Sequence, residues 1–306
     1  MTIEEARTLI RGVEWRGSRP GLSRVRELLH RIGDPQDTLQ FVHIAGTNGK
    51  GSTAAMLAAV LQAAGYTTGL FTSPFLEQFA ERMQVNGQPI PDAELAAACE
   101  TLQPCIAAMD DQPTEFELVT CVALEFFARR QCDIVVLEAG MGGALDSTNV
   151  IDTPELAIIT AMGLDHMRFL GDTLAEISRQ KAGIIKENGD VVIYGRCPEA
   201  EAVFERVCEA RHARLYRPDA AQLVQGAFGL SGQSFSYAGY AVLWIPLVGS
   251  YQPYNAAVVL TGVDVLRNKG RDIPQWAVRE GLRSVHWPAR FEVLRQAAPV
   301  CIVDGG

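Results

Sequence analysis

The stretch that decides the fold is His43-Ile44-Ala45-Gly46-Thr47-Asn48-Gly49-Lys50-Gly51-Ser52. It joins a β-branched apolar run to an Ala-rich helical pattern over residues 52–64. A turn between a buried strand and a helix directs backbone N–H groups and the positive end of the helix dipole to one place, which suits phosphate. Glycines let the backbone approach a ligand closely, and Lys50 adds a charge for the outer phosphates. We therefore expect this loop to bind the phosphates of a nucleotide, ATP.

The spacing of the loop departs from the common pattern G-x-x-x-x-G-K-[ST]. Fewer residues separate Gly46 from Gly49-Lys50 than in that pattern, and Gly51 intervenes between Lys50 and Ser52. The alternative is an ordinary glycine-rich turn with an exposed lysine, which the strand-to-helix context disfavours. The candidate phosphate-binding residues are Gly46, Thr47, Asn48, Gly49, Lys50, Gly51 and Ser52.

Apolar runs alternate with helical patterns on both sides of this loop. The predicted strands are residues 41–45, 67–71, 134–137, 156–160 and 191–194, and the predicted helices are residues 52–64, 92–109, 114–130, 174–186 and 199–211. Two of the helices open with capping-box spacing, Thr114…Glu117 and Thr173…Glu176. Continuously apolar strands separated by helices predict an α/β fold with a mostly parallel, doubly wound sheet covered on both faces.

The pattern changes after Leu215. Aromatic and β-branched residues among Gly and Ser predict short antiparallel strands over residues 215–247, and helices follow at 253–266 and 274–282. Residues 286–290 read as a hinge before the apolar run 300–303. One strand ending in a glycine turn leaves backbone groups without neighbours. We therefore predict an ATP-binding domain over residues 1–288 and, over 289–306, the start of a truncated second domain of Rossmann-like fold.

Composition excludes several classes of function. The chain has 306 residues and a net charge of −9, with no basic run that would bind nucleic acid or an anionic membrane. No apolar stretch reaches membrane-spanning length, and the acidic N-terminus argues against a signal peptide. Its seven cysteines form no CxxC pair, which favours free thiols in a reducing compartment. We expect a cytoplasmic monomer.

Three segments with polar side chains follow predicted strands at the edge where ligands of such sheets collect. Ser73 could coordinate Mg²⁺ or belong to a plain Ser-Pro turn. Glu138 directly follows a buried strand, so its carboxylate must be paired, hydrogen-bonded or metal-bound, and we favour a metal role over a helix cap. Asp165-His166 supports a ligand and a capping or core pair equally. Lys181, which borders an apolar stretch, reads from the residues alone as a surface lysine.

Together these motifs make the chain resemble the folylpolyglutamate synthase/dihydrofolate synthase family of the Mur ligase superfamily. The likeness runs almost end to end. Its motifs are Ser18–Leu22, His43–Ser52, Thr72-Ser73-Pro74, Glu81-Arg82, Leu137-Glu138…Gly142-Gly143…Leu145-Asp146…Thr148-Asn149-Val150, Asp165-His166, Lys181–Ile185, Gln252…Asn255-Ala256-Ala257 and Trp287-Pro288…Arg290-Phe291-Glu292. Several unrelated spacings agree at once, which makes the set specific.

The resemblance implies a reaction. Mg²⁺-ATP phosphorylates the γ-carboxylate of a folate, and the amine of L-glutamate attacks the acyl phosphate to form an amide. The acceptor is a reduced folate or dihydropteroate, so dihydrofolate synthase activity stays open beside tetrahydrofolylpolyglutamate synthesis. Ala144 stands where relatives usually carry Arg, which bears on that choice.

The resemblance also implies roles for single residues. Gly49, Lys50 and Gly51 hold the phosphates beside Ser52; Ser73 and Glu138 hold one Mg²⁺ and His166 a second; Lys181 is carbamylated; Asn255 and Arg290 contact ATP; and Asp304 begins a further nucleotide-contacting motif. Lys50, Lys181 and His166 are the candidate catalytic residues. Two alternatives remain: a phosphotransferase or ATPase that uses the same loop, and a nucleotide-binding module that is inactive in this truncated form.

Overall fold

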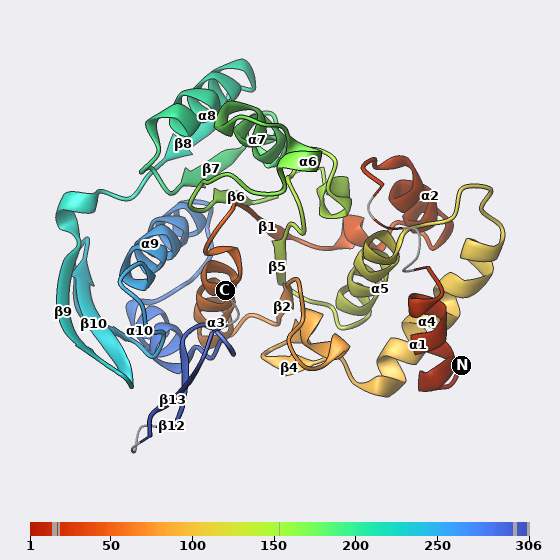
Figure 1. Ribbon diagram of the computed structural model, residues 1–306, viewed down its shortest axis with the longest axis horizontal. Coiled ribbons are helices and arrows are strands. Elements are labelled where there is room, and N and C mark those ends of the chain that lie inside the picture. The colour runs from red at the N-terminus through yellow and green to blue at the C-terminus, as the bar shows by residue number, and fades with distance from the viewer. Residues whose placement is uncertain (14–16, 18, 153, 296–298, 305–306) are drawn as a thin grey trace.

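Parallel strands with helices between them form the centre of the molecule (Figure 1). The computed structural model describes residues 1–13, 17, 19–152, 154–295 and 299–304. Among these residues, the main sheet has eight strands in the order β4-β3-β2-β5-β1-β6-β7-β8. Its strands are β1 (Phe41–Ala45), β2 (Thr68–Phe71), β3 (Met83–Val85), β4 (Gln88–Pro89), β5 (Ile134–Glu138), β6 (Leu156–Ile159), β7 (Asp190–Ile193) and β8 (Arg214–Tyr216). Neighbours from β2 to β8 pair in parallel, while β3 and β4 extend the sheet antiparallel.

Helices cover both faces of this sheet. The helices are α1 (Ile3–Arg11), α2 (Ser23–Arg31), α3 (Lys50–Ala63), α4 (Asp92–Ala107), α5 (Glu115–Arg129), α6 (Met167–Leu170), α7 (Leu174–Lys181), α8 (Pro198–Ala210), α9 (Gln252–Asn268) and α10 (Gln275–Ser284), and the short 3₁₀ turns are Pro35–Thr38, Phe79–Arg82, Ser147–Val150, Ala182–Ile184 and Ala220–Gln222. One apolar core lies between the sheet and α3, α9 and α10. On the opposite face, α1, α2, α4 and α5 share a second core, and α8 shares a third with the 3₁₀ turn Ala182–Ile184.

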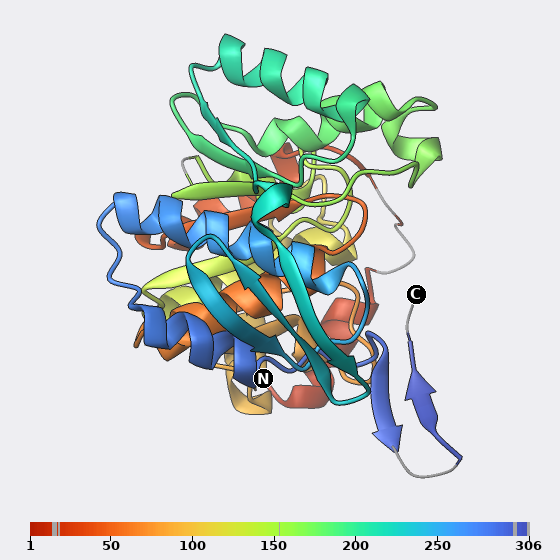
Figure 2. The same cartoon turned by 90° about the vertical axis from the view of Figure 1, so that its left-hand side faces the viewer.

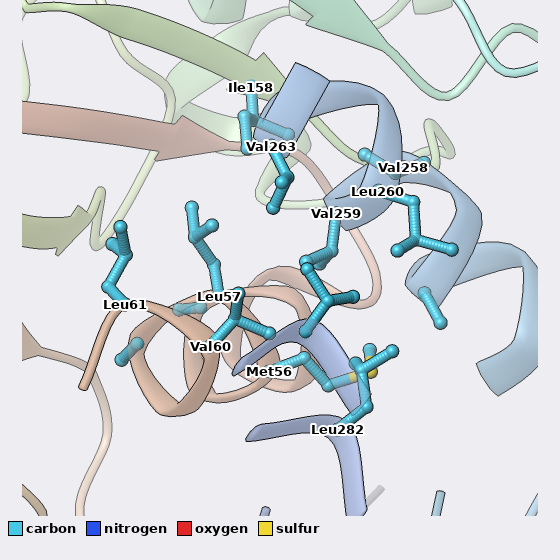
Figure 3. Close-up of a cluster of buried hydrophobic side chains, with 14 of the residues drawn as sticks. Met56, Leu57, Val60, Leu61, Ile158, Val258, Val259, Leu260, Val263 and Leu282 are labelled. Atoms are coloured by element: carbon cyan, nitrogen blue, oxygen red, sulfur yellow. The ribbon is translucent and has the colours of Figure 1, made fainter. Parts of the chain in front are cut away.

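The core beside α3 fixes the helix that carries the loop. Figure 3 shows Met56, Leu57 and Val60 of α3 facing α9 and α10, with Ile158 of β6 nearby. Because the side chains of α3 from Ser52 to Leu57 are all buried, this helix is enclosed on every side in its first turns. Its N-terminus is therefore held rigidly at the edge of the sheet, as an anion-binding helix end requires.

The predicted doubly wound sheet is confirmed, since each of the five predicted strands forms within two residues of its expected position. Both capping boxes are confirmed too: the Thr114 and Thr173 side chains accept from the backbone N–H three residues on. Some boundaries were wrong. Leu215 belongs to β8 of the large sheet rather than to the antiparallel region, and α7 ends at Lys181 instead of continuing to residue 186.

The antiparallel region is a separate small sheet of β9 (Val224–Gly229), β10 (Gly232–Tyr237) and β11 (Tyr240–Ile245), three strands within the described chain. It packs on α9 and α10 through the inward residues of β10 and β11. A further hairpin, β12 (Glu292–Arg295) with β13 (Cys301–Val303), projects from the body (Figure 2). The proposed boundary at residues 288 and 289 remains a prediction. Among the described residues, no helix is long and apolar enough to cross a membrane.

Candidate active site

The loop after β1 lies at the carboxyl edge of the sheet, with β5 on one side and β6 on the other. The backbone N–H groups of Thr47 and Asn48 donate to the carbonyl of Ala161, at 2.9 and 3.1 Å. The Thr47 hydroxyl also donates to the carbonyl of Gly163, at 3.0 Å. The loop is thus tied to the segment that follows β6, at a sheet edge where ligands of open α/β folds bind.

Two glycines of the loop are required by their surroundings. Gly46 has a φ of +152°, and a Cβ there would lie 1.9 Å from the Thr160 hydroxyl oxygen. Gly49 has a φ of +83°, and a Cβ there would lie 3.0 Å from Oδ1 of Asn255. Helix α3 starts at Lys50. The backbone conformations of Gly46 and Gly49 therefore direct the first N–H groups of this helix to the open side of the turn.

One side of the loop is formed by amides from the first turn of α9. The Gln252 side-chain amide donates to the Ser52 hydroxyl oxygen at 3.2 Å. The Asn255 amide nitrogen donates in turn to the Gln252 side-chain oxygen at 3.0 Å. All three side chains are buried. Asn255, an expected ATP contact, thus lies against Gly49 and is fixed by Gln252.

Lys50 and Glu138 form the opposite, charged side. The Lys50 ammonium is half-buried and donates to the carbonyl of Thr47 at 3.2 Å. Glu138, the last residue of β5, is 3% exposed. Burial raises the pKa of its carboxyl to about 7, although Lys50, the Ser73 N–H and Arg290 all act to lower it. The Ser73 N–H is 3.4 Å from the carboxylate, a weak contact. Glu138 is therefore a buried carboxylate with less compensation than its charge needs.

Lys181 completes the charged side from the last turn of α7. It is 1% exposed, and its ammonium donates to the carbonyl of Gly46. Burial, and then repulsion from Lys50, lowers its pKa to about 8, against the attraction of Asp165 and Asp146. The interpretation as a surface lysine is therefore wrong. The burial of Lys181 could not be predicted from its apolar neighbours, because it depends on the contact with Gly46, which is distant in the sequence.

Ser73 and His166 lie on the wall of a neighbouring cavity of about 470 Å³. Other lining residues are Gly140–Gly143 in the turn after β5, Thr114–Phe116 at the start of α5, Arg19 before α2 and Arg82 at the end of the 3₁₀ turn Phe79–Arg82. His166 has a φ of +48° and is half-exposed, with Nε2 3.6 Å from a carboxylate oxygen of Asp165. With this backbone turn, His166 lines the cavity and does not lie in the apolar core, where one interpretation of the sequence had placed it.

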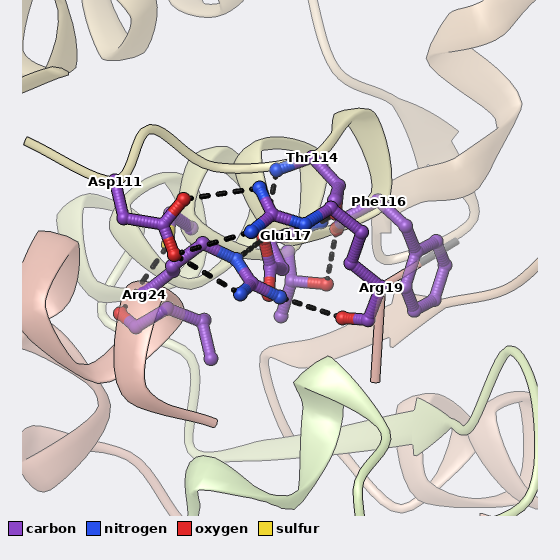
Figure 4. Close-up of polar contacts among 9 residues, drawn as sticks. Arg19, Arg24, Asp111, Thr114, Phe116 and Glu117 are labelled. Atoms are coloured by element: carbon purple, nitrogen blue, oxygen red, sulfur yellow. Dashed lines mark hydrogen bonds and ion pairs between the residues drawn. The ribbon is translucent and has the colours of Figure 1, made fainter. Parts of the chain in front are cut away.

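A partly buried ion-pair network supports another wall of this cavity (Figure 4). The Arg24 guanidinium donates to both carboxylate oxygens of Glu117, at 3.0 and 2.8 Å, and Glu117 also caps α5 through Thr114. Asp111 accepts from Arg24 and from Arg19, at 3.3 and 3.0 Å. The network therefore joins Arg19, a cavity-lining residue, to the helix start that carries Phe116.

Two residues predicted to contact the nucleotide, Arg290 and Asp304, differ in how close they lie to the charged side of the loop. Arg290 is close enough to Glu138 to lower its pKa. Asp304 is exposed just after β13, and within the described ranges it makes no hydrogen bond or ion pair with the loop. Among those residues, no three His, Cys, Asp or Glu side chains are grouped to hold a metal. A metal bound by Glu138 would therefore take its other ligands from hydroxyl, water or phosphate oxygens.

Comparison with known proteins identifies the family. The family model described as Mur ligase middle domain matches residues 44–263. The dihydrofolate synthase/folylpolyglutamate synthase of Bacillus subtilis is 40% identical over 314 residues, which cover 99% of this chain and 72% of that protein. The chain belongs to the folylpolyglutamate synthase and dihydrofolate synthase family of Mur ligases. The resemblance inferred from the motifs is thereby confirmed.

Other members of the family agree in sequence and in fold. The folylpolyglutamate synthase of Lacticaseibacillus casei is 38% identical over 92% of this chain and 68% of its own length. A solved FPGS–AMPPCP–folate complex superposes with a TM-score of 0.91 at 35% identity, over 100% of this chain and 77% of that one. The fold described above is therefore the family fold.

Two buried residues of the site were not given roles by the sequence analysis. Gln252 and Arg82 had appeared there as parts of motifs alone. The Arg82 guanidinium is buried between the rings of Phe79 and Phe116, 5.8 and 5.5 Å from their centroids, and donates to Glu115 at 2.8 Å. A polar side chain within a specific motif is the signal that could have marked both.

Proposed function

We propose that this chain is an ATP-dependent ligase that joins L-glutamate to the γ-carboxylate of a folate. Membership of the family supports the reaction, and solved complexes of relatives with the ATP analogue AMPPCP support ATP as the nucleotide. One structural observation carries the proposal. A phosphate-binding loop, two under-compensated buried charges and a cavity of about 470 Å³ share one edge of the sheet.

The reaction needs positioning and charge neutralisation more than covalent help from the protein. An oxygen of the folate carboxylate attacks the γ-phosphorus of ATP, and the bond to the ADP oxygen breaks. The amine of L-glutamate then attacks the acyl carbon, loses a proton and expels inorganic phosphate. We infer that the N–H groups in the first turn of α3, together with Lys50, neutralise the phosphates, and that the cavity holds the carboxylate donor beside them.

Glu138 and Ser73 are the residues that would hold one Mg²⁺, and His166 would hold a second. Glu138 fits a cation, because its pKa of about 7 shows a buried carboxylate that its neighbours do not fully compensate. Mg²⁺ prefers one or two carboxylates and leaves its other positions to water and phosphate oxygens, which suits a site with a single buried acid. When bound, the ion would neutralise charge on the phosphates.

Lys181 is proposed to carry a carbamate. A neutral amine is the form that attacks CO₂; the N–C bond forms and the nitrogen loses a proton, which leaves an anion. Burial and Lys50 both disfavour the ammonium form of Lys181, and an anion there would attract Lys50 instead of repelling it. Wild-type protein in ¹³C-bicarbonate should show a carbamate carbon signal by NMR that Lys181→Gln lacks. Active wild type without that signal would refute the modification.

The ligase function is tested by omitting substrates. With ATP and Mg²⁺, ADP formation should require both a folate and L-glutamate, and product mass should rise by one glutamyl residue. Dihydropteroate and tetrahydrofolate, compared in parallel, decide between dihydrofolate synthase and folylpolyglutamate synthase activity. ADP formation without glutamate would indicate an ATPase or phosphotransferase. Nucleotide binding without turnover in any combination would indicate a binding module.

A further inference from the structure

Ser52 is a buried hydroxyl at the start of α3 that receives a hydrogen bond from another helix. Its side-chain oxygen accepts from Nε2 of Gln252, at 3.2 Å, across 200 residues of sequence. A serine hydroxyl offers one O–H donor and two acceptor lone pairs. Within the described part of the chain, the O–H of Ser52 has no acceptor. The hydroxyl is therefore left with a donor to offer and stands in the first turn of α3, directly after the Gly46 loop.

Gln252 is held so that it donates. It is fully buried, and its side-chain oxygen already accepts from Nδ2 of Asn255, at 3.0 Å. Its amide nitrogen is consequently the end that faces Ser52. Oδ1 of Asn255 lies against Gly49, so the chain of contacts runs from the loop, through α9, and back to the loop.

The turn before α9 is fixed as well. Gln233 of β10, 4% exposed, donates to the carbonyls of Leu247 and Gly249, both at 2.8 Å. The Gly249 carbonyl accepts in turn from the Gln252 backbone N–H, at 3.1 Å. The position of Gln252 is thus set by the small sheet and does not depend on a ligand.

We infer that Gln252 is a positioning residue for ATP: by donating to Ser52, it makes the Ser52 hydroxyl a donor to a phosphate oxygen. Ser52 then adds a side-chain hydrogen bond to those of the loop N–H groups. Charge-assisted bonds of this kind are among the stronger ones in proteins. The inference rests on ATP binding at this loop, as proposed above, and is independent of which folate the chain accepts.

A double-mutant cycle on AMPPCP affinity tests the inference. Gln252→Leu should raise the Kd for AMPPCP roughly five- to tenfold, about the value of one net hydrogen bond. In a Ser52→Ala background, the same substitution should change Kd less than about twofold, because its effect passes through the hydroxyl. Equal effects in both backgrounds would mean that Gln252 acts only on structure, and would overturn the inference.

Gln252→Glu tests the direction of the hydrogen bond. A carboxylate can only accept, so it would take the Ser52 proton away from the phosphates, and the Kd should rise more than in Gln252→Leu. Unchanged or tighter binding by Gln252→Glu would overturn donation by Gln252. Thr261→Val, on the same helix away from the loop, should bind as wild type does, and thermal unfolding of each variant reports folding separately. Wild type without AMPPCP affinity would refute nucleotide binding itself, and this inference with it.

Discussion

The two sides of the Gly46 loop differ in how completely their buried polar groups are satisfied. On the amide side, Ser52, Gln252 and Asn255 are neutral and hydrogen-bonded to one another. On the charged side, Glu138 and Lys181 are as deeply buried, yet burial dominates the pKa of both. The amide side is therefore neutral and lacks only an acceptor for the Ser52 O–H within the described residues, whereas the charged side holds two buried charges that its neighbours compensate only in part.

This difference indicates that the amide side fixes the geometry of the loop and that the charged side binds ligands. Satisfied buried networks fix geometry, and incompletely compensated charges are costly in the folded chain unless something binds them. Perturbed pKa values gather at functional sites for that reason. Substitutions on the two sides should therefore have opposite effects on stability, although both should weaken function.

The largest effect is expected from Lys50→Ala. Loop N–H groups without the ammonium cannot neutralise the outer phosphates, so kcat/KM for ATP should fall roughly a thousandfold or more. ADP formation with saturating folate and glutamate measures this. Arg283→Ala, which removes an exposed cation paired with Glu280 on α10, should leave the rate unchanged. Near-normal turnover by Lys50→Ala would refute the proposal that Lys50 neutralises the outer phosphates.

A smaller and pH-dependent effect is expected from Glu138→Gln. The folded pKa of about 7 lies above the ordinary value of 4.5 for a glutamate carboxyl. The folded state therefore binds a proton that the unfolded state releases between these values, and the free energy of unfolding of ligand-free wild type should fall as pH rises from about 4.5 to 7. The total is roughly 3 kcal/mol. Glu138→Gln lacks this titration, so it should be the more stable protein at pH 8.

Urea unfolding at pH 5 and pH 8 measures that difference. Glu209→Gln, at an exposed site on α8, should keep the wild-type dependence on pH. The same Glu138→Gln protein should need more Mg²⁺ for half-maximal ADP formation. If Glu138→Gln were less stable than wild type at pH 8 and its Mg²⁺ titration were unchanged, two claims would be contradicted: that the buried Glu138 carboxylate destabilises the ligand-free fold, and that it binds Mg²⁺.

The sequence predicted the charged side better than the amide side, for a physical reason. Glu138 directly follows an apolar strand, and the carboxyl ends of parallel strands meet at one edge, so its place near the loop could be inferred from pattern. Lys50 lies within the loop itself. The large sheet was predictable on the same grounds, because continuously apolar strands between helices have few other solutions.

The amide side depends on contacts that no local pattern encodes. Gln252 reaches Ser52 from 200 residues away, and the path passes through the small sheet and its packing on α9. The burial of Lys181 likewise follows from a tertiary contact with Gly46. Arg24 is a similar case, since its pairing with Glu117 joins α2 to α5 over 93 residues. Neutral amides also lack the charge that makes a buried acid conspicuous in sequence.

The smallest of the three effects, with the opposite sign to Glu138→Gln, is expected from Asn255→Ala. The substitution leaves the Gln252 side-chain oxygen without its donor in a fully buried place. An unsatisfied buried acceptor costs roughly 1–3 kcal/mol, so the variant should be less stable than wild type by about that amount at both pH 5 and pH 8. Asn268→Ala, at the exposed end of α9, should change stability little. Urea midpoints measure both, and AMPPCP affinity should fall with Asn255→Ala because Gln252 and Gly49 lose their shared contact. If Asn255→Ala were as stable as wild type while binding weakened, the amide would serve as a direct nucleotide ligand, and the amide side would no longer differ from the charged side in the way described.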